Sequence, residues 1–437
     1  MNRQLSQGSM LLVVFILAGA LCFPTGQTEG KAQKESVSLS YWSVCNFPGY
    51  DPFWEEVAKK FTAQRPDVDL ELKLTCIPYQ GYEAKYQSAF NAKKGPDMFW
   101  DMTHVTAGQL RVSEKMPDDI AKSIEKISAG PGAIIGLFDG VRYGVPVEGG
   151  YFQMMFINEK LYREVGLDPG HPAQTYMEML EHAKKLTKYD ASGKIIRSGW
   201  GIRYSGHPFG IADKAVPFVD AWGAKLMDWD QRKASGYVNS PEAVEAIDFY
   251  GGLVTKHRVS SVELGLPEEI FAQENGAIMF RECFMVAWLK KSNPDLQYRV
   301  VPLPKHKVSS GYAGNFPWSI QVNKDAPEKH RKWAWELIRF YVGSKELRKQ
   351  HAVLADMITP FADILGEPEF VKHPAYQAFM TMAKGRAATN YHIPPAQEIL
   401  QVFGQACLDV MFAKDTPKPA LDKAAASMDA ILARYKK

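Results

Sequence analysis

Aromatic and polar side chains gather where the first three predicted strands end. Residues 37–100 show a pattern of strand, helix, strand, helix and strand, which predicts a parallel α/β sheet. The strand ends carry Trp42 to Asn46, Tyr79 to Tyr82 and Trp100 to His104. Ligands bind beyond the carboxyl ends of parallel strands, so we expect these segments to form a binding site.

No catalytic or metal-binding motif accompanies these side chains. The sequence contains no H-E-x-x-H, G-x-S-x-G, Walker or G-x-G-x-x-G motif. Asp228-Trp-Asp230 begins like a calcium loop, but Arg232 stands at a ligand position. The five cysteines form no C-x-x-C pair and have no zinc-site spacing. We expect no metal, no cofactor and no catalysis, although paired carboxylates for glycoside hydrolysis leave no recognisable spacing.

Length and charge narrow the class of protein further. A chain of 437 residues exceeds what one hydrophobic core usually organises, so two lobes with a cleft between them are expected. The formal net charge of +3 and the absence of a concentrated Lys/Arg cluster in the sequence argue against a nucleic-acid partner.

The first 22 residues are typical of a signal peptide. Arg3 precedes an apolar run from Met10 to Phe23, which is too short for a permanent membrane span. Cleavage after Ala20 and lipid attachment at Cys22 are both open, although Leu21 departs from the usual lipoprotein pattern. Residues 23–36 would form a polar tether. We expect an exported protein, either periplasmic or anchored as a lipoprotein to the outer face of a membrane.

Two cysteines follow predicted strands of the same lobe. A disulfide between Cys45 and Cys76 is compatible with an oxidising compartment, and so are two buried free thiols.

An ordered set of segments resembles the extracellular sugar-binding proteins of ABC importers, the family of maltose-binding and glycerol-3-phosphate-type binding proteins. The set spans nearly the whole chain after the signal peptide and includes Leu39-Ser-Tyr-Trp42, Gly95-Pro-Asp-Met-Phe-Trp100, Tyr143-Gly-Val-Pro146, Asn275-Gly-Ala-Ile-Met279 and Tyr298-Arg-Val-Val-Pro-Leu-Pro304. No single segment is diagnostic, but their order and spacing are.

The resemblance implies a periplasmic-binding-protein-like fold, with two α/β lobes, a hinge of three crossover segments and a helical C-terminal region. The crossings would lie near Tyr143, near residues 275–279 and near Val322. By this interpretation lobe 1 comprises residues 37–143 and 279–322, and lobe 2 comprises residues 144–278 and 323–437.

The resemblance also implies a function. The protein would bind a mono- or oligosaccharide between its lobes as a monomer and deliver it to ABC permease subunits in the membrane. Two alternatives stay open: an exported carbohydrate-active enzyme, and an importer binding protein for a non-sugar solute.

A sugar site needs flat aromatic faces and charged or amide side chains that bind hydroxyl groups. Glu148 matches a ligand-binding position of the family, and residues 311–318 resemble its ligand-proximal loop. Arg281 and Glu282 are either hydroxyl partners or a structural ion pair. The tryptophans at strand ends are either exposed platforms or core. The candidate ligand-binding residues are Trp42, Asn46, Tyr79, Tyr82, Trp100, Asp101, Thr103, His104, Glu148, Tyr151, Trp222, Arg281, Glu282, Asn315 and Trp318.

Overall fold

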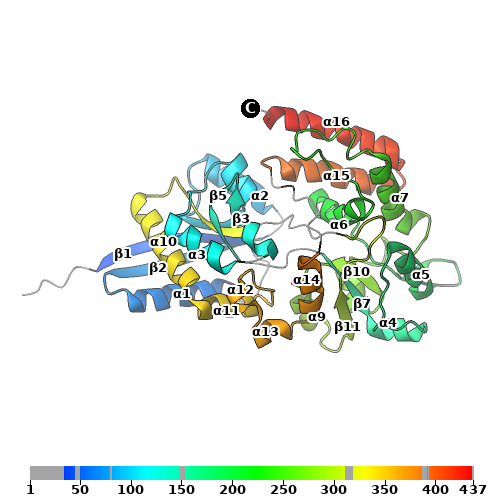
Figure 1. The fold of residues 1–437 in the computed structure, drawn as a ribbon, viewed down its shortest axis with the longest axis horizontal. Helices are drawn as coiled ribbons and strands as arrows, with labels where there is room; N and C mark the ends of the chain where they lie inside the picture. The colour runs from blue at the N-terminus through cyan, green and yellow to red at the C-terminus, as the bar shows by residue number, and fades with distance from the viewer. Residues whose placement is uncertain are drawn as a thin grey trace, which may run out of the picture.

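A computed structural model describes residues 34–44, 50–78, 81–128, 130–147, 153–310, 318–385, 391 and 393–435. Two lobes lie side by side, each with its own sheet surrounded by helices (Figure 1). Among the described residues, none of the helices has the length and apolar character that crossing a membrane requires.

The first lobe contains a five-stranded sheet in the order β2-β1-β3-β12-β6. β1 pairs in parallel with both β2 and β3, which confirms the expected parallel start, and β12 is antiparallel to β3 and β6. The strands are β1 (Glu35–Val44), β2 (Val68–Ile77), β3 (Met98–Met102), β6 (Gly144–Pro146) and β12 (Trp318–Val322). Two short strands, β4 (Leu137–Phe138) and β5 (Val141–Arg142), form a separate hairpin.

Helices cover this sheet because each presents an apolar stripe to it. In α1 (Tyr50–Gln64) the buried residues Phe53, Val57 and Phe61 recur every four positions and share one helix face. The Phe61 ring lies 5.6 Å from that of Phe340 on α10. The other elements of this lobe are α2 (Tyr82–Asn91), the π-helix η1 (His104–Gln109), α3 (Asp118–Ile127), the 3₁₀-helix η2 (Gly130–Ile134), α10 (Glu328–Gly343) and α11 (Lys345–Leu354).

The second lobe contains a three-stranded sheet in the order β10-β7-β11. Its central strand β7 is buried throughout, because both of its edges and both of its faces are covered. The strands are β7 (Met154–Asn158), β10 (Ile278–Arg281) and β11 (Tyr298–Val301), with a separate pair β8 (Lys188–Tyr189) and β9 (Ile195–Arg197).

Most of the remaining helices surround this second sheet (Figure 1). They are α4 (Glu159–Glu164), α5 (Tyr176–Leu186), α6 (Pro208–Ala221), α7 (Pro241–Thr255), α8 (Pro267–Ala272), α9 (Met285–Ser292), α14 (Tyr376–Ala383), α15 (Ala396–Met411) and α16 (Pro417–Tyr435). Two single-turn helices, α12 (Ala362–Leu365) and α13 (Pro368–Val371), precede α14.

The strand pairing corrects part of the expected lobe boundaries. Residues 279–301 were expected in lobe 1, but β10 and β11 pair with β7 in the second sheet. Helices α10 and α11 were expected in lobe 2, but they pack on α1, where the Phe53 ring stacks 4.6 Å from His351. The physical reason is that a short apolar strand pairs equally well with many partners, so its own sequence does not select its sheet.

Candidate ligand-binding pocket

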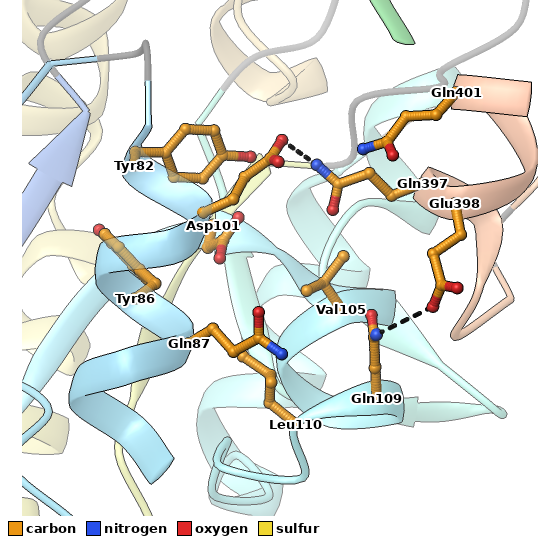
Figure 2. A pocket seen from close by; sticks show the side chains of 11 residues that line it. Tyr82, Tyr86, Gln87, Asp101, Val105, Gln109, Leu110, Gln397, Glu398 and Gln401 are labelled. Atoms are coloured by element: carbon orange, nitrogen blue, oxygen red, sulfur yellow. Dashed lines mark hydrogen bonds between the residues drawn. The ribbon is translucent and has the colours of Figure 1, made fainter. Parts of the chain in front are cut away.

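A pocket of about 260 Å³ lies between the two lobes. One wall comes from α2, β3 and η1 of the first lobe, and the other from the first turns of α15 in the second (Figure 2). The lining residues are Tyr82, Glu83, Tyr86, Gln87, Asp101, Val105, Gln109, Leu110, Gln397, Glu398 and Gln401.

Two carboxyl groups stand on the first-lobe wall. Asp101, at the end of β3, is 2% exposed and accepts a hydrogen bond of 2.7 Å from the backbone N–H of Met102. Burial, with a smaller contribution from the charge of Glu83, raises the pKa of Asp101 to about 8. Burial raises the pKa of Glu83 to about 7. Near neutral pH these carboxyl groups can therefore both donate and accept hydrogen bonds, as sugar hydroxyls require.

Amide and carboxylate side chains of α15 form the opposite wall. The Gln397 side-chain amide donates a hydrogen bond to the Glu83 carboxylate across the pocket. Gln109 of η1 donates to Glu398 over 3.4 Å (Figure 2). Gln397 and Gln401 are four positions apart and so lie on one face of the helix. This wall was not predicted from the sequence, although two glutamines at helical spacing at the start of an apolar-striped helix indicate it.

Four of the predicted aromatic residues lie together in the first lobe. The Trp318 ring is 4.9 Å from Trp100 and 5.4 Å from Tyr82, and Trp42 is 5.6 Å from Tyr86. Four of these rings are nearly fully buried, with Tyr82 2% exposed and Tyr86, Trp100 and Trp318 each 1% exposed. Tyr82 and Tyr86 are among the described lining residues of the pocket, and the two buried tryptophans are not. These two tryptophans are therefore core residues behind the pocket wall, which is one of the two possibilities that the sequence left open. Trp42 is only half-buried.

Two predicted polar residues lie beneath the pocket. Thr103 shares a hydrogen bond of 2.8 Å with Ser319 of β12, and His104 begins η1. Both are buried and are not among the described lining residues. Their placement ties the end of β3 to its neighbouring strand.

Arg281 and Glu282 belong to a buried cluster of charges in the second lobe. Arg281 pairs with Glu282 over 3.2 Å and also with Glu268. Lys214 on α6 pairs with Asp213 over 2.8 Å and also with Glu282. Burial opposes ionisation of Glu282, but Lys214 and Arg281 outweigh it and hold its pKa well below the usual range. The sequence left open whether Arg281 and Glu282 are hydroxyl partners or a structural ion pair, and the structure shows the ion pair.

The structure does not bring Trp222 to the pocket. Its ring lies in the second-lobe core, 5.0 Å from Phe249 and stacked 3.9 Å from His306. Other predicted positions fall outside the described residues: Asn46, Tyr79, Glu148, Tyr151, Asn315, Cys22 and Cys45.

The cysteines and candidate metal ligands can be described in part. Cys76 is disulfide-bonded, whereas Cys283 and Cys407 are buried thiols outside any disulfide. Within the described ranges, no group of three or more His, Cys, Asp or Glu side chains is arranged to hold a metal ion.

Comparison with known proteins shows which proteins this chain resembles. The chain is 23% identical over 393 residues to a maltotriose-binding protein of Pyrococcus abyssi (strain GE5 / Orsay), covering 87% of this chain and 77% of that protein. Among solved structures, it resembles an ABC transporter solute-binding protein of Thermotoga lettingae TMO bound to alpha-D-tagatose, with a TM-score of 0.74, 21% identity and coverage of 90% and 99% of the two chains.

A second solved structure is the maltose/maltodextrin-binding domain of Bdellovibrio bacteriovorus bound to maltotriose. It has a TM-score of 0.75, 15% identity and coverage of 91% of this chain and 100% of that one. These structural likenesses confirm the periplasmic-binding-protein-like fold. The profile of the bacterial extracellular solute-binding proteins matches residues 56–381. The chain therefore belongs to the family of bacterial extracellular solute-binding proteins.

Proposed function

We propose that this protein is the solute-binding component of an ABC importer and that it binds a carbohydrate in the pocket between its lobes. The observation that carries the proposal is the pairing of Glu83 and Asp101 on one lobe with Gln397 and Gln401 on the other. Hydroxyl groups of a sugar can bridge such walls, since carboxyl and amide groups together offer donors and acceptors. Tyr82 and Tyr86 line the same pocket, but their rings are only 2% and 1% exposed.

The relatives support a sugar as the solute. One is a maltotriose-binding protein, and the two solved structures hold alpha-D-tagatose and maltotriose. The match to solute-binding proteins argues against the alternative of a carbohydrate-active enzyme. A non-sugar solute is the alternative that the experiment below distinguishes.

Binding would favour the closed arrangement of the lobes, because a solute that contacts both walls interacts more strongly when the walls are close. The segments that join the two sheets would act as the hinge. Permease subunits, which are separate chains, would recognise the closed monomer. Residues 1–22 would direct export, and either cleavage after Ala20 or lipid attachment at Cys22 would leave residues 23–36 as a tether.

A panel of solutes tests the proposal directly. The exported form would be melted with maltose, maltotriose, mannobiose, tagatose, ribitol, amino acids and short peptides. A sugar present at 100 times its Kd should add about 2.7 kcal/mol to the free energy of unfolding. The Glu83→Gln variant should weaken that binding, and Glu55→Gln on the exposed face of α1 should not. A response to amino acids or peptides alone would refute the sugar assignment.

A further inference from the structure

A second, larger cavity lies beside the proposed sugar pocket. Its volume is about 750 Å³, within the range of small-molecule sites. Gln109 lines both cavities, so they meet at this side chain. The lining residues include Gln109, Arg111, Arg232, Lys233, Arg434 and Tyr435.

The charge of this cavity is its distinguishing feature. Four of its described lining residues are cationic, namely Arg111, Arg232, Lys233 and Arg434, and none is acidic. Arg434 pairs with Glu398 over 2.6 Å. In the part of the chain that the structure describes, no carboxylate lies within 4.0 Å of the other three cations. Glu398 pairs with Arg434, and Asp228 and Asp429 bind the backbone of the loop that carries Arg232 and Lys233, so the cavity lining is cationic while carboxylates lie close behind it.

The loop that carries two of the cations is held in place. The Asp228 carboxylate accepts hydrogen bonds from the backbone N–H groups of Arg232 and Lys233, at 2.7 and 3.0 Å. Asp429 of α16 accepts a hydrogen bond of 2.6 Å from the backbone N–H of Ala234. The loop is thereby fastened to the helix that carries Arg434, so the backbone that bears Arg232 and Lys233 is fixed beside the cavity.

The opposite cation comes from the other lobe. Arg111 follows η1 and has a φ of 56°, a left-handed conformation that few residues other than glycine adopt. Three backbone hydrogen bonds surround it, among them that of Val112 N–H with Thr106, at 2.8 Å. A ligand placed between Arg111 and Arg232 would therefore contact both lobes, as in the neighbouring pocket.

Hydrogen-bonded polar side chains lie where the two cavities meet. Gln109 donates to the Tyr435 hydroxyl over 3.3 Å, and Tyr435 donates to Glu398 over 3.0 Å. Ile393, Pro394 and Leu432 add apolar side chains to the lining of the basic cavity. Apolar surface together with guanidinium groups suits a sugar ring that carries an anionic substituent, because each carboxylate can bind a guanidinium with two parallel hydrogen bonds.

We propose that the basic cavity binds the anionic unit of an acidic oligosaccharide whose neighbouring sugar unit occupies the pocket of Glu83 and Asp101. The inference rests on the proposed function and names its solute class, a sugar with carboxylate or ester-linked sulfate groups. Cations gathered in a concave site joined to the pocket favour a solute group over a flat protein partner. An acidic segment of the permease is the competing occupant.

Titration calorimetry with defined oligosaccharides tests this proposal. The exported form is titrated with trigalacturonate, with the neutral α-1,4-galactotriose and with a sulfated maltotriose. We expect at least one anionic ligand to bind ten or more times more tightly than the neutral trisaccharides, and we expect 500 mM NaCl to reduce this advantage at least threefold. The two anionic ligands distinguish a carboxylate from a sulfate.

Charge-matched variants locate the effect. The double variant Arg232→Gln/Lys233→Gln should lose at least tenfold in affinity for the anionic ligand and keep its melting temperature. Its control, Lys59→Gln/Lys94→Gln, removes two exposed lysines of the first lobe that lie outside both cavities and should change affinity less than twofold. An equal loss in both variants would reduce the effect to net charge and overturn the proposal.

The remaining outcomes separate this proposal from the proposed function. If neutral sugars bind and the anionic ones bind no more tightly, the basic cavity is not a solute site but sugar binding stands. If neither neutral nor anionic sugars bind, both the proposed function and the proposal for the basic cavity fail. If sugar affinities are unchanged in Arg232→Gln/Lys233→Gln while uptake through the permease falls, the cavity is a docking surface and the solute proposal is overturned.

Discussion

The side-chain amide of Gln397 on α15 donates a hydrogen bond to the carboxylate of Glu83 on α2. The two residues are far apart in sequence and belong to different lobes, so this bond closes one side of the candidate pocket. It also brings the two lobes into direct contact.

Removing this contact should weaken solute binding. Gln397→Ala eliminates a hydrogen bond to a carboxylate, which typically contributes about 1.5–3 kcal/mol, and it also removes a candidate ligand partner. We expect sugar affinity to fall at least tenfold, measured by titration calorimetry. Gln405→Ala is the matched control, because Gln405 lies on the exposed face of the same helix. Equal affinities for Gln397→Ala and the wild type would exclude this contact from binding.

The burial of Asp101 predicts how stability depends on pH. Its pKa in the folded protein, about 8, is above the ordinary value of 3.8, so folding favours the protonated form. This contribution is complete below about pH 4 and is lost as the pH rises through 8. We expect Asp101→Asn to gain stability relative to the wild type between pH 5 and 8.5, on the order of 2 kcal/mol in urea unfolding.

Two features sharpen that measurement. Glu83 titrates in the same range, with a pKa of about 7, so Asp101→Asn should flatten the pH dependence without abolishing it. Asp69→Asn, at a position 68% exposed, should leave the dependence unchanged. A wild-type protein and an Asp101→Asn variant with parallel pH profiles would show that Asp101 is ionised throughout.

A substitution of Trp100 tests whether this residue belongs to the core or forms a platform for the ligand. It is 1% exposed and packs against Trp318, so Trp100→Ala should lower the solute-free stability by about 3–5 kcal/mol. Trp229→Ala, at a position 81% exposed, should change it by less than about 0.5 kcal/mol. If Trp100→Ala were instead as stable as the wild type and bound sugar poorly, the ring would be a ligand platform.

The sequence predicts those parts of the fold that depend on local patterns. The stripe of Phe53, Val57 and Phe61 lies within one helix, and its spacing alone defines the buried face. The parallel pairing of β1, β2 and β3 follows from alternation of strands with helices in consecutive chain segments. The alternation therefore predicts that the segments carrying Tyr82 and Asp101 lie at one edge of the sheet, and both residues line the pocket.

Features that depend on residues far apart in the sequence could not be predicted from local patterns. Whether a tryptophan at a strand end is covered depends on its partner, and Trp100 is covered by Trp318, a residue more than 200 positions away. The same holds for Gln397, which becomes a pocket residue only because α15 lies opposite α2. The position of β10 is a further example, since its pairing with β7 depends on which strand has a free edge in the folded protein.

The buried charge cluster should be sensitive to the loss of one member. Lys214→Met leaves Asp213 and Glu282 buried without their shared cation, which typically costs about 3–5 kcal/mol. Lys256→Met removes an exposed pair with Asp248 and should cost no more than about 1 kcal/mol. Both values come from urea unfolding at pH 7. Similar small losses in the two variants would mean that water reaches the cluster around Lys214.

The disulfide of Cys76 provides the last test. Val44, the last residue of β1, pairs with Ile77, and Cys45 is the next residue in the sequence. We propose a Cys45–Cys76 bond, which non-reducing peptide mapping should recover as one linked fragment. Cys45→Ser and Cys76→Ser should each lower stability by about 2–4 kcal/mol, and the double variant should cost no more than either single one. A thiol of Cys45 that reacts with maleimide in the unfolded, non-reduced chain would contradict this pairing.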